Sequence, residues 1–390
     1  MNVIATCGVA IPLPGDVPAG VYEKLPRGNF IDELVWKKLQ SLGIVPSAVA
    51  DDARFLRRVH LDLIGRLPTP EEVQAFLADQ TPNKRTRVVD ELLERPEYAD
   101  HWAGKWADLL RPNPYRVGIK AVFNYDQWIR DSFRRNKPYD QFVRELVTAQ
   151  GSTWRNGAAT LFRDRREPDE LTTIVSQLFL GIRLECAKCH HHPFEIWGQD
   201  DFYSFAAFFA RVGHKGTGLS PPISGGEEMI ITAKTGQVQH PITQKVLEPR
   251  PLFALTSAAT GTTPNKPADA PPAAANVAEL DDPRIALADW MTADANPFFA
   301  QVMVNRVWAD LMGRGLVEPV DDLRATNPAS NPPLLTALAD EFRRQKYDIK
   351  KLLRTITTSQ VYSLSSLANE RNTADTRNYS RHYRTRLRAE

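Results

Sequence analysis

The segment LTTIVSQLF, residues 171–179, places its apolar side chains three and four residues apart. This spacing predicts an amphipathic helix with a buried apolar face. A second apolar stripe, formed by Phe202, Phe205, Ala206 and Phe209, follows after an interval that holds cysteines and histidines. We therefore expect a short turn that is fixed between two buried helices, so that its reactive side chains stand on a rigid support.

Helical signals continue through most of the first 212 residues. Asn29 stands where an N-cap is expected, just before an apolar-periodic segment. Thr69-Pro70-Glu71-Glu72 has the pattern of a capping box with proline at the first helical position. Tryptophan and phenylalanine stripes between residues 102 and 146 are interpreted as core rather than as the wall of a cofactor site. The predicted fold class is therefore mainly α.

Composition divides the chain into four parts. Residues 28–212 are predicted to form one helical domain, and residues 213–255 a small insertion of short strands, because glycine, proline and alternating residues appear there. Residues 256–280 are rich in Ala, Thr and Pro, which predicts a disordered linker. Helical periodicity returns in residues 281–390, the second predicted helical domain.

The overall composition narrows the classes of function. Hydrophobic residues make up 42% and charged residues 25% of the chain, which is ordinary for a globular protein. The net charge of +2 gives no global signature of nucleic-acid binding. No apolar run approaches the roughly 20 residues of a membrane span. Residues 1–7 lack a basic stretch followed by a long apolar core, so no signal peptide is expected here.

Cys186-Ala187-Lys188-Cys189-His190 has the C-x-x-C-H spacing of a c-type haem attachment site. At such a site both cysteines form thioethers to the porphyrin, and the histidine ligates the iron. Cys186, Cys189 and His190 are thus the candidate cofactor-binding residues. The second axial ligand is left open. Candidates in the irregular segment that follows are Met229, His214 and His240.

Two other interpretations fit the same segment. Two thiolates and two imidazoles within seven residues suit zinc, although zinc ligands more often come as two pairs separated by a longer loop. The candidate metal ligands are Cys186, Cys189, His190, His192 and His240, with His60 as a possible distant contributor. In the third interpretation the cysteines form a disulfide or a redox thiol pair, and the histidines only make hydrogen bonds.

Other groups are interpreted mainly as structural. His60, two residues before Asp62, is expected to be a core histidine. Asn305-Arg306 and Asp321-Asp322 are expected to fasten a helix to its following loop through an Arg–Asp pair. Gly313 is expected in a turn with positive φ. The sequence contains no P-loop, nucleophile elbow or zincin motif, and no catalytic carboxylate pair can be chosen.

The end of the chain is basic, at Arg381, Arg384 and Arg386 among other positions. Three interpretations are open for this segment: contact with an anionic group, a solvated helix, or the edge of an interrupted domain.

Three long strings carry a resemblance to a known family. They are Phe55 to Pro70 (FLRRVHLDLIGRLPTP), Cys186 to Phe194 (CAKCHHHPF) with its continuation to Phe209, and Asn296 to Asp322 with NPFF, VNRVW and GRGLVEP. The chain resembles the planctomycete and verrucomicrobial cytochrome-associated proteins built from domains of unknown function 1549 and 1553. The first corresponds to the domain at residues 28–212. The second corresponds to residues 281–390, where the chain is expected to be C-terminally truncated.

The resemblance implies an exported protein, periplasmic or extracellular, that is encoded with or fused to cytochrome c modules. It does not by itself imply a reaction. We therefore expect a cytochrome-c-like, haem-binding protein with a role in electron transfer or redox chemistry and a redox protein as partner. The alternative is a zinc-binding or structural protein with no redox role, associated with polysaccharide breakdown.

Overall fold

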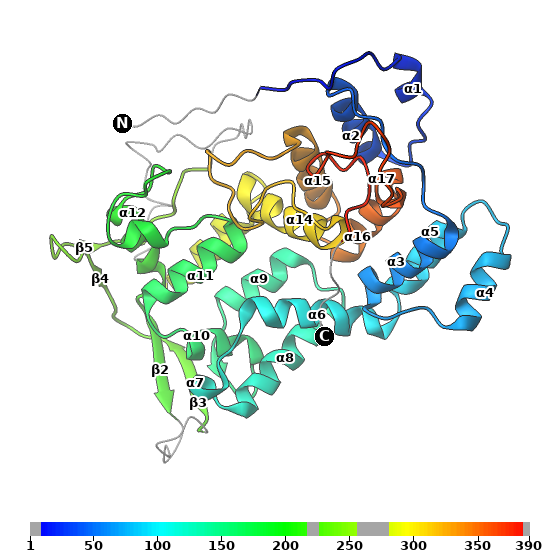
Figure 1. Ribbon diagram of the computed structural model, residues 1–390. Coiled ribbons are helices and arrows are strands. Elements are labelled where there is room, and N and C mark those ends of the chain that lie inside the picture. The colour runs from blue at the N-terminus through cyan, green and yellow to red at the C-terminus, as the bar shows by residue number, and fades with distance from the viewer. Residues whose placement is uncertain (1–8, 217–225, 256–280, 385–390) are drawn as a thin grey trace. The chain divides into compact units, whose positions relative to one another are not determined.

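The computed structural model describes residues 9–216, 226–255 and 281–384 (Figure 1). Helices predominate among these residues, and the strands are few and short. The predicted mainly α fold class is thereby confirmed. The predicted linker at residues 256–280 lies outside the described residues, as do residues 1–8 and Arg386.

The chain folds into two compact units, each assembled from separate segments. The first comprises Met1–Ala5, Ala103–Val302 and Asp321–Thr326, and the second comprises Thr6–Trp102, Met303–Val320 and Asn327–Glu390. The predicted domains are continuous stretches of the chain, whereas each unit combines separate segments. The two divisions are therefore not comparable, and the predicted domain boundaries stay a prediction.

The first unit has a helical core. Its helices are α6 (Pro96–Leu110), α7 (Pro114–Val117), α8 (Ile119–Arg134), α9 (Tyr139–Val147), α10 (Thr160–Asp164), α11 (Pro168–Leu180), α12 (Gln199–Ala206), α13 (Pro283–Thr292) and α14 (Pro297–Met312), with α6 and α14 divided between the units. Trp106 stacks on Phe179 with ring centroids 6.3 Å apart and meets Phe142 edge-on at 5.3 Å. These rings are fully or almost fully buried, which confirms their interpretation as core.

The strands of the first unit form two small antiparallel sheets. β1 (Gly151–Ser152), β3 (Glu228–Thr232) and β2 (Val212–Gly216) pair in that order, and β4 (Val238–Gln239) pairs with β5 (Val246–Leu247). Four of these five strands lie at or within the predicted insertion of short strands. The β4–β5 hairpin contacts α12, so this small sheet is supported by a helix.

The second unit is helical, and local sequence signals set its helix starts. Its helices are α1 (Ala19–Glu23), α2 (Phe30–Ser41), α3 (Asp52–Ile64), α4 (Pro70–Ala78), α5 (Lys84–Leu93), α15 (Pro332–Arg344), α16 (Ile349–Thr357) and α17 (Gln360–Ser363). Asn29 caps α2 through a hydrogen bond from the Ile31 backbone N–H. Thr69 and Glu72 form the predicted capping box of α4, with Pro70 at its first position. Both capping predictions are confirmed.

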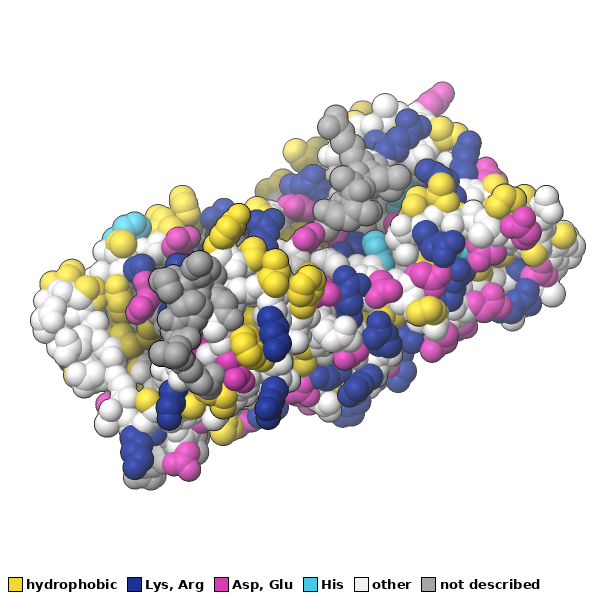
Figure 2. Space-filling model, turned by 90° about the horizontal axis from the view of Figure 1, so that it is seen from below, with side chains coloured by type: hydrophobic (Ala, Val, Ile, Leu, Met, Phe, Trp, Pro, Cys, Tyr) yellow, Lys and Arg dark blue, Asp and Glu magenta, His cyan; other side chains and the backbone are white. Residues whose placement is uncertain are grey.

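The surface carries charges of both signs. On the face in Figure 2, basic and acidic side chains of the described residues are interspersed, in keeping with a net charge of +2. None of the described helices combines the length and the apolar character that a bilayer span requires.

Candidate functional site

The cysteine–histidine segment begins after Gly181, the residue that ends α11, and no other residue fits this position without strain. Gly181 ends α11 with φ +65°, and a Cβ placed there would lie 2.8 Å from Cγ of Leu323. The backbone N–H of Leu323 donates to the carbonyl of Gly181 at 2.8 Å. The chain therefore turns sharply at this point and enters the motif in a fixed direction.

The motif itself is one 3₁₀ turn, Glu185–Lys188, with Cys189 as the residue that ends it. Ala187 is fully buried beneath the turn, whereas Cys186 and Cys189 are exposed and unpaired as free thiols. Side chains three residues apart in a 3₁₀ turn project on the same side. The two thiols therefore stand together on the outer side of a turn that is anchored from below by Ala187.

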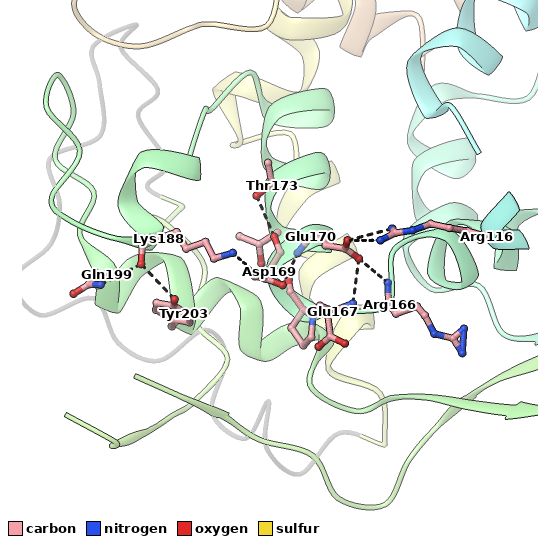
Figure 3. Close-up of polar contacts among 11 residues, drawn as sticks. Arg116, Arg166, Glu167, Asp169, Glu170, Thr173, Lys188, Gln199 and Tyr203 are labelled. Carbon is pink, nitrogen blue, oxygen red and sulfur yellow. Dashed lines mark hydrogen bonds and ion pairs between the residues drawn. The ribbon is translucent and has the colours of Figure 1, made fainter. Parts of the chain in front are cut away.

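Lys188, between the two cysteines, clamps the turn to the flanking helices (Figure 3). Its ammonium group lies 2.5 Å from a carboxylate oxygen of Asp169, in the first turn of α11. Its backbone carbonyl accepts hydrogen bonds from Nε2 of Gln199 at 3.1 Å and from the hydroxyl of Tyr203 at 3.3 Å, both on α12. The expected turn fixed between two helices is confirmed.

The opposite charges of Lys188 and Asp169 stabilise each other. Burial alone raises the pKa of Asp169, but the hydrogen bond and the charge of Lys188 outweigh burial and hold that pKa below its ordinary value. The same hydrogen bond raises the pKa of Lys188. Asp169 also lies at a helix N-terminus, where a carboxylate is favoured. Its neighbour Glu170 accepts hydrogen bonds from Arg116 and from the Arg166 backbone (Figure 3).

His190 is exposed, and one nitrogen of its ring is occupied. Nδ1 lies 2.6 Å from the carbonyl oxygen of His191, and since a carbonyl can only accept, Nδ1 carries the proton. Nε2 has no hydrogen-bond partner among the described residues, so it is the nitrogen that carries the lone pair whenever the ring is neutral. Metal-ligating histidines are oriented in this way by a backbone carbonyl at the other nitrogen. A metal could therefore be bound by this ring only through Nε2.

His192 has a different environment, although it lies only two residues further on. It is buried, and its Nδ1 accepts a hydrogen bond from the Phe194 backbone N–H at 3.2 Å. Burial lowers the pKa of His192, the charge of Arg324 lowers it further, and a backbone hydrogen bond with Arg183 opposes both. Burial and the charge of Arg324 thus favour the neutral ring, and the hydrogen bond from the Phe194 backbone ties this ring to the loop that leaves the turn.

His240 lies in the β4–β5 hairpin, next to the clamp rather than in the turn. Its Nδ1 accepts from the backbone N–H groups of Ile242 and Thr243, each at 3.2 Å, and its Nε2 lies 3.7 Å from a carboxylate oxygen of Asp200. Its ring centroid is 6.1 Å from that of Tyr203. The structure therefore gives His240 a hairpin-forming role and places it one aromatic side chain away from Lys188.

The other candidate ligands lie in other surroundings. His214 and Met229 belong to the three-stranded sheet, and Nδ1 of His214 lies 3.3 Å from a carboxylate oxygen of Glu228. His60 belongs to the second unit, whereas Cys186 belongs to the first. No group of three or more His, Cys, Asp or Glu side chains in the described residues is arranged to hold a metal ion.

A small cavity opens beside Cys186, within the first unit. Its volume is about 180 Å³, below the roughly 300–1,000 Å³ of typical small-molecule sites. It is lined by Ile182, Arg183, Cys186, His192, Pro193, Phe194, Glu195, Trp197, Phe298, Asp322, Leu323 and Arg324. This cavity is too small to enclose a haem.

Sequence reasoning named Asp322 but missed the other charged residues that line this cavity, Arg183, Glu195 and Arg324. Glu195 is half-buried, which raises its pKa, and it accepts a hydrogen bond from the Ala325 backbone N–H at 2.7 Å. The guanidinium of Arg324 lies over the ring of Phe194, 5.2 Å from its centroid. Arg183 donates to Asp321 at 2.6 Å. Glu195 and Arg183 could have been found as neighbours of the motif, but Arg324 comes from a distant segment.

Two further residues named in the sequence analysis, His60 and Asp62, lie in the second unit. His60 is buried in α3, with Nδ1 3.0 Å from the carbonyl of Leu56, which confirms a core histidine. Asp62 accepts instead from the hydroxyl of Tyr362 at 2.7 Å.

Asn305 fastens α14 to its following loop. Its side-chain amide donates to the carbonyls of Val317 and Val320 and accepts from the Val317 backbone N–H. Gly313 has the expected positive φ, +78°. The expected pairing of Arg306 with Asp321 or Asp322 stays a prediction.

Fold and site together define a mainly helical protein with an exposed dithiol–imidazole turn on a buried support. Residues 30–214, which contain this turn, match the family described as protein of unknown function (DUF1549), and residues 283–390 match the family described as protein of unknown function (DUF1553). The chain therefore contains one domain of each of these two families. No curated protein and no solved structure matches the chain.

Proposed function

We propose that the protein holds one haem covalently at Cys186 and Cys189, with His190 as an axial iron ligand, and acts in electron transfer or an associated redox process. The observation that carries this proposal is the geometry of the turn. Two exposed free thiols lie three residues apart at this turn, and the next residue offers an imidazole whose Nδ1 is engaged by a backbone carbonyl. C-x-x-C-H sites need these three groups in this order.

Attachment of a haem needs no reactant other than the two thiols and the vinyl groups of the haem. Each thiol adds across one vinyl double bond, so that sulfur bonds to one carbon and the thiol hydrogen ends on the other. No oxidant or reductant is consumed, provided both cysteines are reduced, and both are free thiols here. Once bound, a haem supplies a one-electron redox centre.

The protein's own residues orient the attachment point. The Lys188–Asp169 ion pair and the two hydrogen bonds to the Lys188 carbonyl hold the thiols in place, and the His191 carbonyl orients the His190 ring. His192 is a poor second axial ligand, because it is buried and its Nδ1 accepts a hydrogen bond from the Phe194 backbone N–H. The exposed position of both cysteines suits electron exchange between a bound haem and a redox protein partner.

We further propose a periplasmic or extracellular location. Covalent haem attachment in bacteria is normally completed outside the cytoplasm, so a haem-bearing form of this protein requires export. A link to polysaccharide breakdown stays a prediction, since no reaction follows from the described site.

Zinc is the second candidate for the same turn. The available Nε2 of His190 favours it as well, and with two thiolates it makes three ligands of kinds that zinc prefers. A fourth ligand would come from solvent or from another side chain. In this alternative the protein has no redox role, and its purified form contains about one equivalent of zinc and has no visible absorption band.

A pair of neighbouring histidine substitutions separates these outcomes. With haem attached, His190→Ala is expected to shift and weaken the Soret band, because the iron loses its imidazole ligand. His191→Ala is the matched control, since His191 is equally exposed and contributes only its backbone carbonyl to His190. The measurement is the visible spectrum of both variants after production with a haem-maturation system.

Identical spectra for His190→Ala and the unsubstituted protein would refute iron ligation by His190. If neither protein has a visible band, elemental analysis decides between the metals. Suppose that the zinc content is near one equivalent, falls in His190→Ala and persists in His191→Ala. This result would identify zinc, rather than haem, as the group bound at the turn.

A further inference from the structure

A second cavity lies within the second unit, at residues that the haem proposal does not use. Its volume is about 770 Å³, within the range of small-molecule binding sites. It is lined by segments far apart in the sequence: Gly313, Arg314 and Glu318 after α14, and Ser366, Leu367, Ala368, Thr376, Arg381, Tyr383 and Arg384 near the end of the chain. Arg381 and Arg384 belong to the basic segment noted in the sequence.

The charge of this cavity is unbalanced. Three arginines line it, and its lining contains one carboxylate, that of Glu318. That carboxylate already accepts a hydrogen bond from the Gly315 backbone N–H at 2.5 Å. Within the part of the chain that the structure describes, Arg314, Arg381 and Arg384 form no ion pair with any carboxylate. The cavity therefore presents three guanidinium groups whose charge is not neutralised locally.

Arg381 is held in position by neutral groups. Its Nη2 donates to the backbone carbonyls of Asp375 at 3.3 Å and of Thr373 at 3.5 Å, and its guanidinium lies over the ring of Tyr383, 5.7 Å from the centroid. Its Nε is buried and has no hydrogen-bond partner among the described residues. If this guanidinium bound an anion in the cavity, no existing hydrogen bond of Nε would have to break.

The nearest acidic side chain is occupied elsewhere. The carboxylate of Asp375 accepts from the Ser380 hydroxyl at 2.6 Å and from the backbone N–H groups of Arg377 and Asn378. Burial alone raises the pKa of Asp375, but these hydrogen bonds, with that of Ser380 the largest, hold it below its ordinary value. Asp375 thus braces the segment 375–380 and does not neutralise Arg381. The segment is not a solvated helix, because residues 377–384 have no helical structure.

We propose that this cavity binds an organic ligand through an oxyanion group, a sulfate, a phosphate or a carboxylate, held by Arg314, Arg381 and Arg384. Guanidinium groups bind these oxyanions through paired hydrogen bonds and carry their charge at every physiological pH. The wall formed by Leu367, which is 53% exposed, and Ala368 gives a carbon skeleton an apolar surface to lie against. This function is separate from the haem turn.

The test is a titration of the full chain with inorganic sulfate, inorganic phosphate and acetate at constant ionic strength, with chloride as the reference salt, followed by calorimetry. At least one oxyanion is expected to bind saturably, and the preferred probe identifies the oxyanion class. Arg381→Gln and Arg314→Gln are each expected to weaken that binding by about tenfold or more. Arg377→Gln, an exposed arginine in the same segment that does not line the cavity, is expected to leave it unchanged.

Two results would overturn the proposal: no oxyanion binds more tightly than chloride, or all three variants bind like the unsubstituted protein. Thermal unfolding of each ligand-free variant checks its fold. Arg314→Gln decides the matter if Arg381→Gln does not fold, because Arg314 makes no side-chain hydrogen bond among the described residues.

Discussion

The double substitution Cys186→Ser with Cys189→Ser is expected to abolish covalent haem. After production with a haem-maturation system, the denatured double variant should have the mass of the polypeptide alone and no Soret band. The physical reason is that a serine hydroxyl does not add to a vinyl group, and the only two cysteines of the turn are then gone. Each single substitution leaves one thioether and is expected to give a lower yield of attached haem.

Stability controls keep this result interpretable. Both cysteines are exposed, so their replacement by the nearly isosteric serine is expected to change the free energy of unfolding by no more than about 0.5 kcal/mol. The third cysteine supplies a matched control, since Cys7→Ser should retain the haem of the unsubstituted protein. Haem that stays attached through denaturation in the double variant would contradict the proposed attachment sites.

Trp197→Ala is expected to cause the largest loss of stability near the site, about 3–5 kcal/mol in the free energy of unfolding. The Trp197 side chain is 1% exposed and lines the cavity beside Cys186. Its backbone carbonyl accepts from the His192 N–H at 2.8 Å, so the ring and the loop that leaves the turn are fixed together. Loss of the ring leaves a void under this loop, which should also lower the yield of attached haem.

Phe194 offers the control for this substitution, because it lines the same cavity but is 54% exposed. Phe194→Ala loses mainly its contact with the Arg324 guanidinium and should cost about 1 kcal/mol or less. Denaturant unfolding followed by circular dichroism measures both variants. Equal destabilisation by the two substitutions would mean that Trp197 does not anchor the loop.

Local sequence patterns predicted the local structure well. Asn29 and Thr69 begin their helices because a capping side chain needs only donors two or three residues away. The apolar stripe in residues 171–179 is buried because helical periodicity places those side chains on one face. These signals also located the cysteine–histidine turn between two helices.

Contacts between distant segments were not predictable in this way. Nothing in the spacing of residues relates Leu323 to Gly181, or Ala325 to Glu195, yet these hydrogen bonds hold Leu323 and Glu195 in the wall of the cavity. The adjacent histidines were also misleading, because spacing alone groups His192 with His190. The irregular loop turns His192 inward to backbone partners and leaves His190 exposed, and no periodic rule describes a loop's individual dihedral angles.

The intact mass of the denatured, unsubstituted protein tests the central claim most directly. The chain would be produced with an export leader and a haem-maturation system, beside a c-type cytochrome made in the same cells as a positive control. The proposal predicts a mass increase equal to one haem that survives denaturation, together with a Soret band. An unmodified mass for this protein, while the control cytochrome carries its haem, would contradict it.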